Sequence, residues 1–138
     1  MESLETKLRT AGVTPTRQRL EIARVMFSRA GHFSADQILG MVNATRPATS
    51  KATVYNTLKL FMARGLIRAV IADPNKVFYD SNIAPHHHFY DAQSGELTDI
   101  DAAGVEVLGL PPLPDGVVTE GLDIVVRVRT GARGGSSA

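Results

Sequence analysis

The 138-residue sequence has no cysteine and no tryptophan, and aromatic residues make up only 6% of it. Without cysteine it cannot form a disulfide framework, a thiolate nucleophile, or a Cys-ligated zinc or iron–sulfur site. No apolar run approaches the roughly 18 residues of a membrane span, and the N-terminus lacks the basic-then-apolar pattern of a signal peptide. We therefore expect a cytoplasmic protein without a membrane partner.

The sequence also lacks the motifs of common hydrolytic and group-transfer enzymes. It has neither a Gly-rich phosphate loop nor a Gly-x-Ser-x-Gly nucleophile elbow. With 43% hydrophobic and 21% charged residues, the composition is nevertheless that of an ordinary globular protein. We therefore expect a binding or regulatory protein rather than an enzyme.

Charge is distributed unevenly along the chain, although the formal net charge is only +1. Residues 1–82 contain 12 Lys and Arg against 6 Asp and Glu, whereas residues 83–138 contain 3 against 8. A basic part joined to an acidic part is typical of a nucleic-acid-binding module followed by a module with another role. A chain with two solvated surfaces of opposite charge would show the same counts of charged residues. The motifs must therefore decide between this interpretation and nucleic-acid binding.

Apolar spacing and capping residues predict four helices in the first 65 residues. In the last of them, Val54, Leu58 and Phe61 recur at three- and four-residue intervals and form one apolar stripe. A β-hairpin follows directly, and helices followed by a hairpin are the order of a winged helix-turn-helix domain. The helices are expected at 4–11, from Pro15 to Gly31, from Ser34 towards Pro47 and from Ser50 to Gly65, with hairpin strands at 66–72 and 77–79.

The remaining residues predict a second, smaller domain. Strands at 88–91 and 97–100 flank the turn Gln93-Ser94-Gly95, and Asp101 begins a short helix that ends near Gly109. Val117 and residues 124–128 are the last strand candidates, and the Gly/Ser-rich end reads as a flexible tail. About 55 residues bury little surface alone, so we expect this segment to form a homodimer.

The helix after Ser50 has the composition of a DNA recognition helix. Its apolar stripe faces the core, which leaves a polar, partly basic face outward. Tyr can contact a thymine methyl, Asn can pair with adenine, and Lys can neutralise phosphate. The alternative is an ordinary polar helix face. The excess of basic residues in residues 1–82 and the hairpin that follows the helix argue against this alternative. The candidate DNA-binding residues are Arg17, Arg19, Ser50, Lys51, Thr53, Tyr55 and Asn56, with Arg46 and Arg64 as further contacts to the DNA backbone.

Three consecutive histidines, His86, His87 and His88, are the other unusual feature. In an extended strand His86 and His88 point to one face and His87 to the other, so two of them can share a metal ion. His32 in the loop before the third helix and Asp99 on the paired strand offer further ligands. Imidazole and carboxylate ligands together suit Zn, Fe or Mn. A solvated turn is the alternative interpretation.

Five segments of the chain carry motifs that occur together, in this order, in one family. They are Thr14-Pro15-Thr16-Arg17, His32-Phe33-Ser34-Ala35, Ala52-Thr53-Val54-Tyr55-Asn56-Thr57-Leu58, Gly65-Leu66 and the His-rich strand. Through them most of residues 4–128 resembles the ferric uptake regulator family. The triple His followed by Phe89-Tyr90-Asp91 is most similar to the iron response regulator branch. The resemblance implies an α+β fold, with an N-terminal winged-helix DNA-binding domain in residues 1–82 and a small α/β dimerisation domain in residues 83–138.

The resemblance also implies two sets of metal ligands. The regulatory site, which joins the two domains in the family, corresponds to His32, His86, His88 and Asp99, with Tyr79 where the family usually has Glu. A second site within the dimerisation domain corresponds to His87 and Glu106. The family's structural Cys₄ zinc cannot form, because Asp91 and Ser94 stand where its first cysteine pair lies.

The function implied by the resemblance is a transcriptional regulator of iron homeostasis genes. It would be a homodimeric repressor or activator that binds a double-stranded DNA operator under the control of Fe, Mn or Zn. The iron response regulator branch adds haem, bound by His86, His87 and His88, as an alternative signal. A peroxide sensor is a variant within the family. A metal or haem carrier without sequence-specific DNA binding is the alternative from another class.

Overall fold

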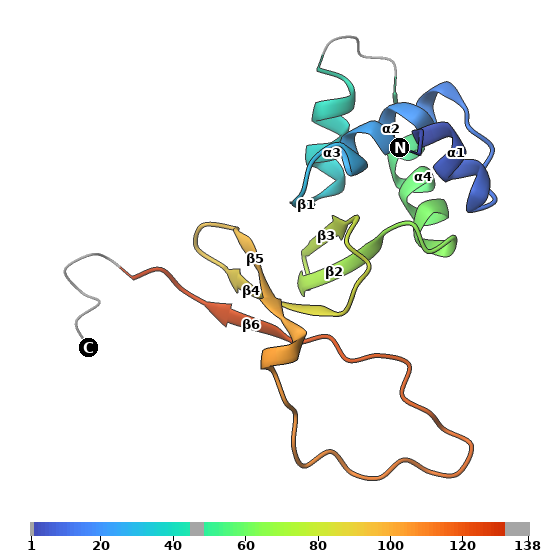
Figure 1. The fold of residues 1–138 in the computed structure, drawn as a ribbon. Helices are drawn as coiled ribbons and strands as arrows, with labels where there is room; N and C mark the ends of the chain where they lie inside the picture. Colours follow the sequence, from blue (N-terminus) through green and yellow to red (C-terminus); the bar gives the residue numbers. More distant parts are fainter. Residues whose placement is uncertain (1, 45–48, 132–138) are drawn as a thin grey trace. The chain divides into compact units, whose positions relative to one another are not determined.

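The computed structural model describes residues 2–44 and 49–131, and the chain divides into two compact units, Met1–Ile83 and Ala84–Ala138. The first unit contains helices α1 (Leu4–Thr10), α2 (Arg17–Phe27), α3 (Ala35–Val42) and α4 (Lys51–Ala63) and a small sheet (Figure 1). The second unit contains a separate three-stranded sheet and a long irregular segment. The predicted α+β architecture with an N-terminal winged helix-turn-helix is confirmed. Arg46 and the predicted tail lie outside the described residues.

Each helix of the first unit begins at a hydroxyl cap. Ser3, Thr16, Ser34 and Ser50 each accept a hydrogen bond from the backbone N–H three residues ahead, at 3.1–3.2 Å. Each such cap satisfies one of the amides left open at a helix start, and it stabilises the helix by about 1 kcal/mol. At α3 the cap is reciprocal, because Gln37 Oε1 accepts from the backbone N–H of Ser34 at 2.8 Å.

The predicted end of α2 was wrong. Pro15 lies near the start of the helix, directly before the cap Thr16, as predicted, but the helix ends at Phe27 instead of at Gly31. The reason is a long-range contact, because the chain after Phe27 must turn to bring His32 into a strand pairing. Helical spacing alone does not reveal such a pairing.

The core of the first unit takes apolar side chains from all four helices. Leu8, Ile22, Ile38, Leu58 and Phe61 are fully buried and form one hydrophobic cluster. Burying each of these side chains stabilises the fold by about 1.5–3 kcal/mol relative to leaving it in water. Because two of them belong to α4, that helix is held by one face while its opposite face stays exposed.

The sheet of the first unit has the strand order β1-β3-β2. Strands β2 (Arg68–Asp73) and β3 (Lys76–Asp80) form the predicted antiparallel hairpin, and Gly65, with a φ of 72°, ends α4 just before it. Strand β1 (His32–Phe33) was not predicted, since two residues carry no strand periodicity. It pairs with β3 and sets His32 directly opposite Asp80.

The second unit is built around β4 (His86–Asp91), which lies between β5 (Leu97–Asp101) and β6 (Val125–Val128). The pairing with β5 is the predicted antiparallel hairpin. The pairing with β6 is parallel and joins residues more than 30 positions apart in the sequence, so local patterns could not show it.

The short helix predicted from Asp101 to Gly109 was wrong. Asp101 does act as a cap, accepting from the N–H of Ala103, but only the 3-10 turn η1 (Ala102–Gly104) follows. Gly104 lacks helix propensity and the valines beyond it are β-branched, so nothing extends the turn. Val117 likewise lies outside any strand, and the chain from 105 to 124 is irregular.

The helices in the described part of the chain are all too short or too polar to cross a membrane.

The core assignment of α4 can be tested with two adjacent residues. Leu58→Ala should lower the free energy of unfolding by about 2–5 kcal/mol, since it removes a fully buried side chain and leaves a cavity. Lys59→Ala, on the exposed side of the same turn, should change it by less than about 0.5 kcal/mol. Urea unfolding followed by far-UV circular dichroism measures both. Equal losses in the two variants would contradict the orientation of the helix.

Candidate metal centre and nucleic-acid surface

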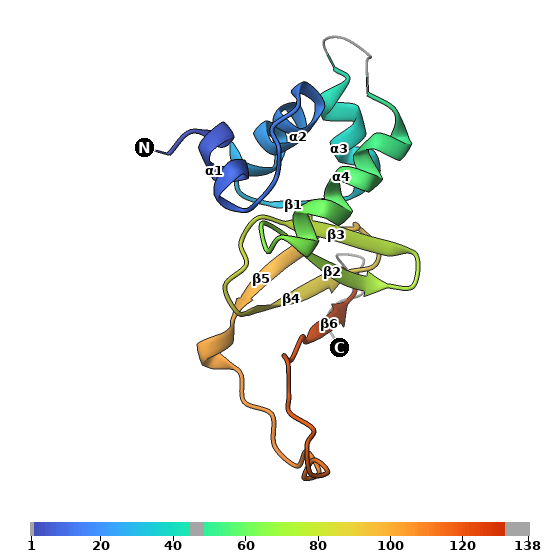
Figure 2. The same ribbon diagram turned by 90° about the vertical axis from the view of Figure 1, so that its right-hand side faces the viewer.

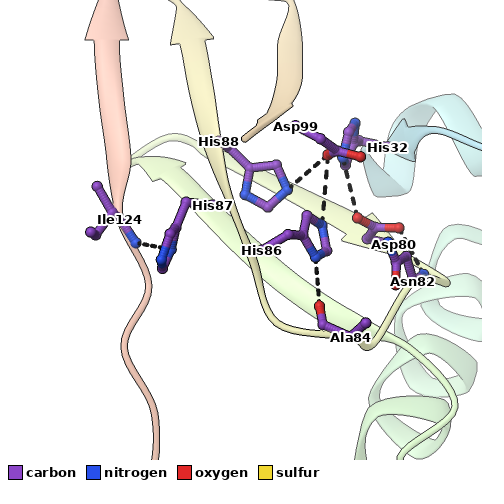
Figure 3. A network of polar contacts seen from close by, with 9 residues as sticks. All are labelled: His32, Asp80, Asn82, Ala84, His86, His87, His88, Asp99 and Ile124. Carbon is purple, nitrogen blue, oxygen red and sulfur yellow. Dashed lines mark hydrogen bonds and ion pairs between the residues drawn. The ribbon is translucent and has the colours of Figure 1, made fainter. Parts of the chain in front are cut away.

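A group of candidate metal ligands lies on one face of the second unit's sheet. Strand β4 alternates its side chains, so His86 and His88 share a face, and the pairing of β4 with β5 sets Asp99 opposite His88. Asp99 Oδ1 lies 3.3 Å from His88 Nε2 and 3.6 Å from His86 Nε2 (Figure 3). The two imidazole rings are 4.5 Å apart, centroid to centroid. Two nitrogens and one carboxylate therefore converge on one point.

Hydrogen bonding leaves His86 ready to bind a metal. Its Nδ1 lies 2.6 Å from the carbonyl oxygen of Ala84, which accepts hydrogen bonds only, so the proton sits on Nδ1. In the neutral ring the lone pair then belongs to Nε2, the nitrogen that faces Asp99. A backbone carbonyl that holds the other ring nitrogen is the usual way of orienting a metal-binding imidazole. The donor chemistry of this set therefore fits a borderline divalent cation.

The first unit holds a second, smaller group of candidate ligands. His32 Nε2 lies 3.2 Å from Asp80 Oδ2, and the two side chains are only 10% and 4% exposed. The backbone N–H of Asn82 donates to Asp80 Oδ1 at 2.8 Å, which fixes the carboxylate at the end of β3 (Figure 3). Burial of a carboxylate is costly without such partners. This pair supplies one imidazole and one carboxylate.

Asp80 was missed in the sequence, where the family's glutamate was matched to Tyr79. The structure shows a carboxylate one position later, and Tyr79 belongs to the hydrophobic core of the unit. Burial raises the pKa of the Tyr79 hydroxyl, and the nearby Tyr55 raises it further, so the side chain is a neutral phenol. Asp80 directly follows Tyr79 in the sequence, so a carboxylate was available there. Its pairing with His32, however, is a long-range contact that the sequence does not show.

His87 and Glu106, the residues of the implied second site, are arranged differently. His87 points to the opposite face of β4, where its Nδ1 accepts from the backbone N–H of Ile124 at 3.1 Å (Figure 3). The neutral ring then carries its proton on Nε2, so neither nitrogen presents a free lone pair. Glu106 is exposed in the irregular segment after η1. Among the described residues, neither belongs to a group of three or more candidate ligands.

Hydrogen bonds hold the β4–β5 turn, which the resemblance matched to the first zinc cysteines of the family. Asp91 Oδ1 accepts from the backbone N–H groups of Gln93 and Ser94, at 2.9 and 3.2 Å. Ser94 Oγ in turn accepts from the N–H of Glu96. The Thr130 hydroxyl donates to the other carboxylate oxygen of Asp91, and this bond, with the backbone ones, lowers the Asp91 pKa to about 2. The turn is therefore closed without a metal.

The outward face of α4 carries most of the predicted DNA-binding residues. Lys51, Tyr55 and Asn56 are exposed, and Thr53 is partly buried. The Lys51 ammonium lies 5.9 Å from the centre of the Tyr55 ring and 3.5 Å from Asp36 Oδ1, both solvent-accessible contacts. Ser50 differs from the others, because its hydroxyl accepts the N–H of Thr53 as the helix cap.

The first turns of α2 and α4 contain basic residues where acids would be more stable. Neither helix has an acidic residue in its first turn, whereas α1 and α3 have Glu5 and Asp36. A helix start carries a partial positive charge, so basic residues there favour an external anion such as phosphate. Between the two helices lies an open cleft of about 320 Å³. It is lined by Thr16, Gln18, Arg19, Thr53, Asn56, Thr57 and Leu60.

Arg19 lines this cleft and Arg17 belongs to the same first turn of α2, and each guanidinium group already makes one contact within the unit. Arg17 Nε lies 3.2 Å from Glu21 Oε1 on the same helix, and Arg19 Nη1 donates to the carbonyl of Thr14 at 2.9 Å. Each keeps further N–H groups, since a guanidinium carries five donors. Five of the seven predicted DNA-binding residues therefore lie on α4 or its cap, and the other two lie at the start of α2.

Comparison with known proteins decides the family. The model of the ferric uptake regulator family matches residues 10–110. This chain belongs to that family. A relative, the peroxide-responsive repressor PerR of Staphylococcus aureus (strain USA300), is 32% identical over 99 residues, which cover 72% of this chain and 67% of the relative.

Solved structures show the same fold at lower identity. The ferric uptake regulator of Pseudomonas aeruginosa with manganese has a TM-score of 0.69 at 20% identity, covering 95% of this chain and 100% of that one. A zinc uptake regulator complexed with zinc and DNA has a TM-score of 0.63 at 21% identity, covering 94% and 89%. Members of the ferric uptake regulator family are metal-responsive transcription regulators, so this chain is a regulator and not an enzyme.

The two faces of β4 can be separated by metal titration. His88→Ala should weaken Mn²⁺ or Co²⁺ binding by about 100-fold or more, since removing a residue that merely orients a ligand already costs roughly 10- to 100-fold. His87→Ala removes the same side chain from the opposite face and should leave the affinity within about threefold of the unmodified protein. Calorimetric titration of the purified full chain measures both affinities. A loss of equal size in both variants would show that the ligand face is misassigned.

Proposed function

We propose that this chain is a cytoplasmic, homodimeric DNA-binding repressor or activator whose operator affinity is set by a divalent metal ion. The observation that carries the proposal is the convergence of His86, His88 and Asp99 on one face of β4 and β5, in a chain of the ferric uptake regulator family. The target genes we propose are those of iron handling. The family match supports regulation, and the donor set supports a metal signal.

The metal is proposed to be iron or manganese, with zinc as the competitor. Imidazole nitrogen with carboxylate oxygen suits all three, whereas the lack of cysteine removes the soft thiolates that favour zinc over iron and manganese. Related regulators have been solved with manganese and with zinc, which supports this range. When bound, the ion supplies a fixed coordination geometry, and the protein supplies the ligands.

Each unit carries an incomplete ligand set, and this supports a switch. The second unit offers two imidazoles and one carboxylate, and the first unit offers His32 and Asp80. A divalent ion of this class takes four to six ligands, so three protein ligands leave at least one coordination position open. We propose that His32 and Asp80 complete the shell, so that the ion couples the DNA-binding unit to the dimerising unit. Half-site spacing on DNA would then depend on metal.

The nucleic-acid surface is proposed to be the outward face of α4 with the starts of α2 and α4. Tyr55 and Asn56 would contact base edges, while Lys51, Arg17 and Arg19 would contact phosphates. The basic first turns of both helices support this assignment, because they place cations where a phosphate is already favoured. Thr53 and the cap residue Ser50, at the start of α4, would position the helix against the DNA.

The place of haem in this scheme depends on the branch within the family. We propose the iron response regulator branch on the basis of the triple His, with haem at His86, His87 and His88 as the alternative signal. Opposite faces of β4 carry these rings, so all three cannot ligate one haem while the strand stays paired. Haem binding would therefore involve either the pair His86 and His88 or a local opening of β6.

A second candidate function within the family is peroxide sensing. The 32% identity to a peroxide-responsive repressor favours it, and so does an all-nitrogen and oxygen ligand set that can hold iron. Peroxide should then abolish operator binding by the iron-loaded protein and leave the manganese-loaded protein unaffected. If both forms keep their operator affinity after peroxide, this candidate is excluded.

A metal or haem carrier remains the alternative from another class. An operator-shift assay with promoter fragments of iron-handling genes separates the two, because a carrier shows no sequence preference. The regulator should bind its operator at least about 10³-fold more tightly than unrelated DNA at physiological salt. Equal affinity for both, with and without metal, would reject the proposed function.

Two substitutions on α4 should separate base contacts from phosphate contacts. Asn56→Ala should weaken specific binding by about 1–3 kcal/mol and leave non-specific binding nearly intact. Lys51→Ala should weaken binding to all sequences alike and reduce the salt slope by roughly one charge. Fluorescence anisotropy at several salt concentrations measures both effects. Identical behaviour of the two variants would show that α4 does not lie in the major groove.

The switch itself is tested by His32→Ala. The variant should still bind metal through His86, His88 and Asp99, although more weakly, because one of the five proposed ligands is missing, and far-UV circular dichroism checks that both units stay folded. Its DNA affinity should no longer respond to metal. The measurement is DNA affinity with and without Mn²⁺ in the variant and in the unmodified protein. An unchanged metal response would rule out His32 as the coupling residue.

A further inference from the structure

Strand β3 places a buried tyrosine directly beside a candidate metal ligand. Tyr79 and Asp80 are consecutive, and consecutive residues of a strand point to opposite faces of the sheet. Asp80 pairs with His32 on one face. Tyr79 points to the other face, where α3 contacts β3 and the tyrosine ring joins the hydrophobic cluster of the first unit. Figure 2 shows β1 beside β3, with α3 and α4 above this sheet.

On the helix side of the sheet lies a small open cleft of about 240 Å³. It is bounded by the start of α3, by α4 and by the turn of the β2–β3 hairpin, and its lining includes Ser34, Asp36, Tyr55, Asn75 and Tyr79. Tyr55 is 44% exposed on the outward face of α4, whereas Tyr79 is only 8% exposed. A residue proposed to contact DNA and a residue next to a proposed metal ligand therefore share one cleft.

The hydroxyl groups of these two tyrosines are both available for a polar contact. In the described part of the chain neither hydroxyl makes a hydrogen bond. The Tyr79 hydroxyl is nevertheless not sealed in the interior, because it still touches solvent although its ring is buried. The cleft, which Tyr79 lines, is where it does so. Burial raises the pKa of Tyr79, and the nearby Tyr55 raises it further, so the hydroxyl is a neutral donor.

Tyr55 is only weakly restrained on its other side. The Lys51 ammonium lies 5.9 Å from the centre of the Tyr55 ring and 3.5 Å from Asp36 Oδ1, and both are solvent-accessible contacts. An exposed aromatic ring with such weak contacts has more than one rotamer open to it. A hydroxyl at the edge of the cleft can therefore select the orientation of the Tyr55 ring.

The backbone connects the walls of this cleft to the ligand pair at two points. His32 lies two residues before Ser34, the cap of α3, and the residue between them, Phe33, pairs with Tyr79. On β3, Tyr79 is followed directly by Asp80. Ligation by His32 and Asp80 would therefore act on the two strands that carry the cleft wall. Packed elements pass on such small displacements because they are close to incompressible.

We propose that Tyr79 is a positioning residue whose hydroxyl orients the Tyr55 ring for base contact, in a way that depends on the occupancy of the His32–Asp80 ligand pair. This inference rests on the proposed function, in which Tyr55 contacts bases and His32 and Asp80 complete the metal shell. Tyr79 is not a ligand in this scheme, since it points to the opposite face of the sheet from Asp80. Metal would then change the choice of operator sequence as well as the affinity.

Tyr79→Phe tests the hydroxyl alone, because it keeps the buried ring. The readout is the specificity ratio, defined as the affinity for the operator divided by the affinity for unrelated DNA. Fluorescence anisotropy measures this ratio with and without Mn²⁺. The change of the ratio with Mn²⁺ should be at least about tenfold smaller in the variant than in the unmodified protein, as expected for one lost base contact. Calorimetry should show an Mn²⁺ affinity within about threefold of the unmodified protein.

Two further variants show whether the effect passes through Tyr55. Tyr55→Phe removes the other hydroxyl at an exposed position and should reduce the metal response as much. The double variant should then lose no more than Tyr55→Phe alone, because the two residues act as one unit. The matched control is Asn75→Ala, which removes a polar side chain from the same cleft but not beside a ligand. Its metal response should stay within about twofold, and far-UV circular dichroism checks the fold of every variant.

The outcomes separate this inference from the proposed function. A full metal response in Tyr79→Phe would overturn the inference, and so would losses that multiply in the double variant, since Tyr79 would then act independently of Tyr55. Weaker Mn²⁺ binding by Tyr79→Phe would identify the phenol as a ligand and contradict the positioning role. An unmodified protein whose operator affinity ignores metal would instead contradict the proposed function itself.

Discussion

The alternation of side chains along β4 is the constraint on which the second unit depends. Three adjacent imidazoles occupy this strand, and a strand sends consecutive residues to opposite faces. His86 and His88 consequently meet Asp99 on one face, while His87 receives the N–H of Ile124 on the other. A one-residue slip of β4 would exchange these roles. The antiparallel pairing with β5 and the parallel pairing with β6 both oppose such a slip.

In the first unit, the side chains that stabilise the fold and those that can contact a ligand lie on opposite faces of one helix, α4. Val54, Leu58 and Phe61 lock one side of α4 into the core, and the helix presents its polar residues on the other side. Its start, like that of α2, carries basic residues instead of acids. Basic residues at these positions lower the stability of each helix by a few tenths of a kcal/mol, and they leave both helix starts suited to binding an anion.

The second unit stays ordered at its β4–β5 turn without the cysteine-bound zinc of the family. The Asp91 carboxylate takes over that position by accepting hydrogen bonds from the turn and from Thr130. Hydrogen bonds of this kind close one turn but bury no apolar surface, so they cannot substitute for a core.

Local patterns in the sequence were sufficient for the helices, the two hairpins and the face shared by His86 and His88. Helix caps, apolar spacing and strand alternation act over a few residues, so the sequence displays them directly. The sequence also offered His32 and Asp99 as candidate ligands, and the resemblance to the family grouped them with His86 and His88 in one predicted regulatory site. The tertiary structure alone decided the rest: the pairing of β1 with β3 that sets Asp80 beside His32, the parallel pairing of β6, and the collapse of the predicted helix to the turn η1. These features depend on strand pairings between residues 37 to 48 positions apart, or on the absence of a partner surface for a helix, and neither leaves a periodic trace in the chain.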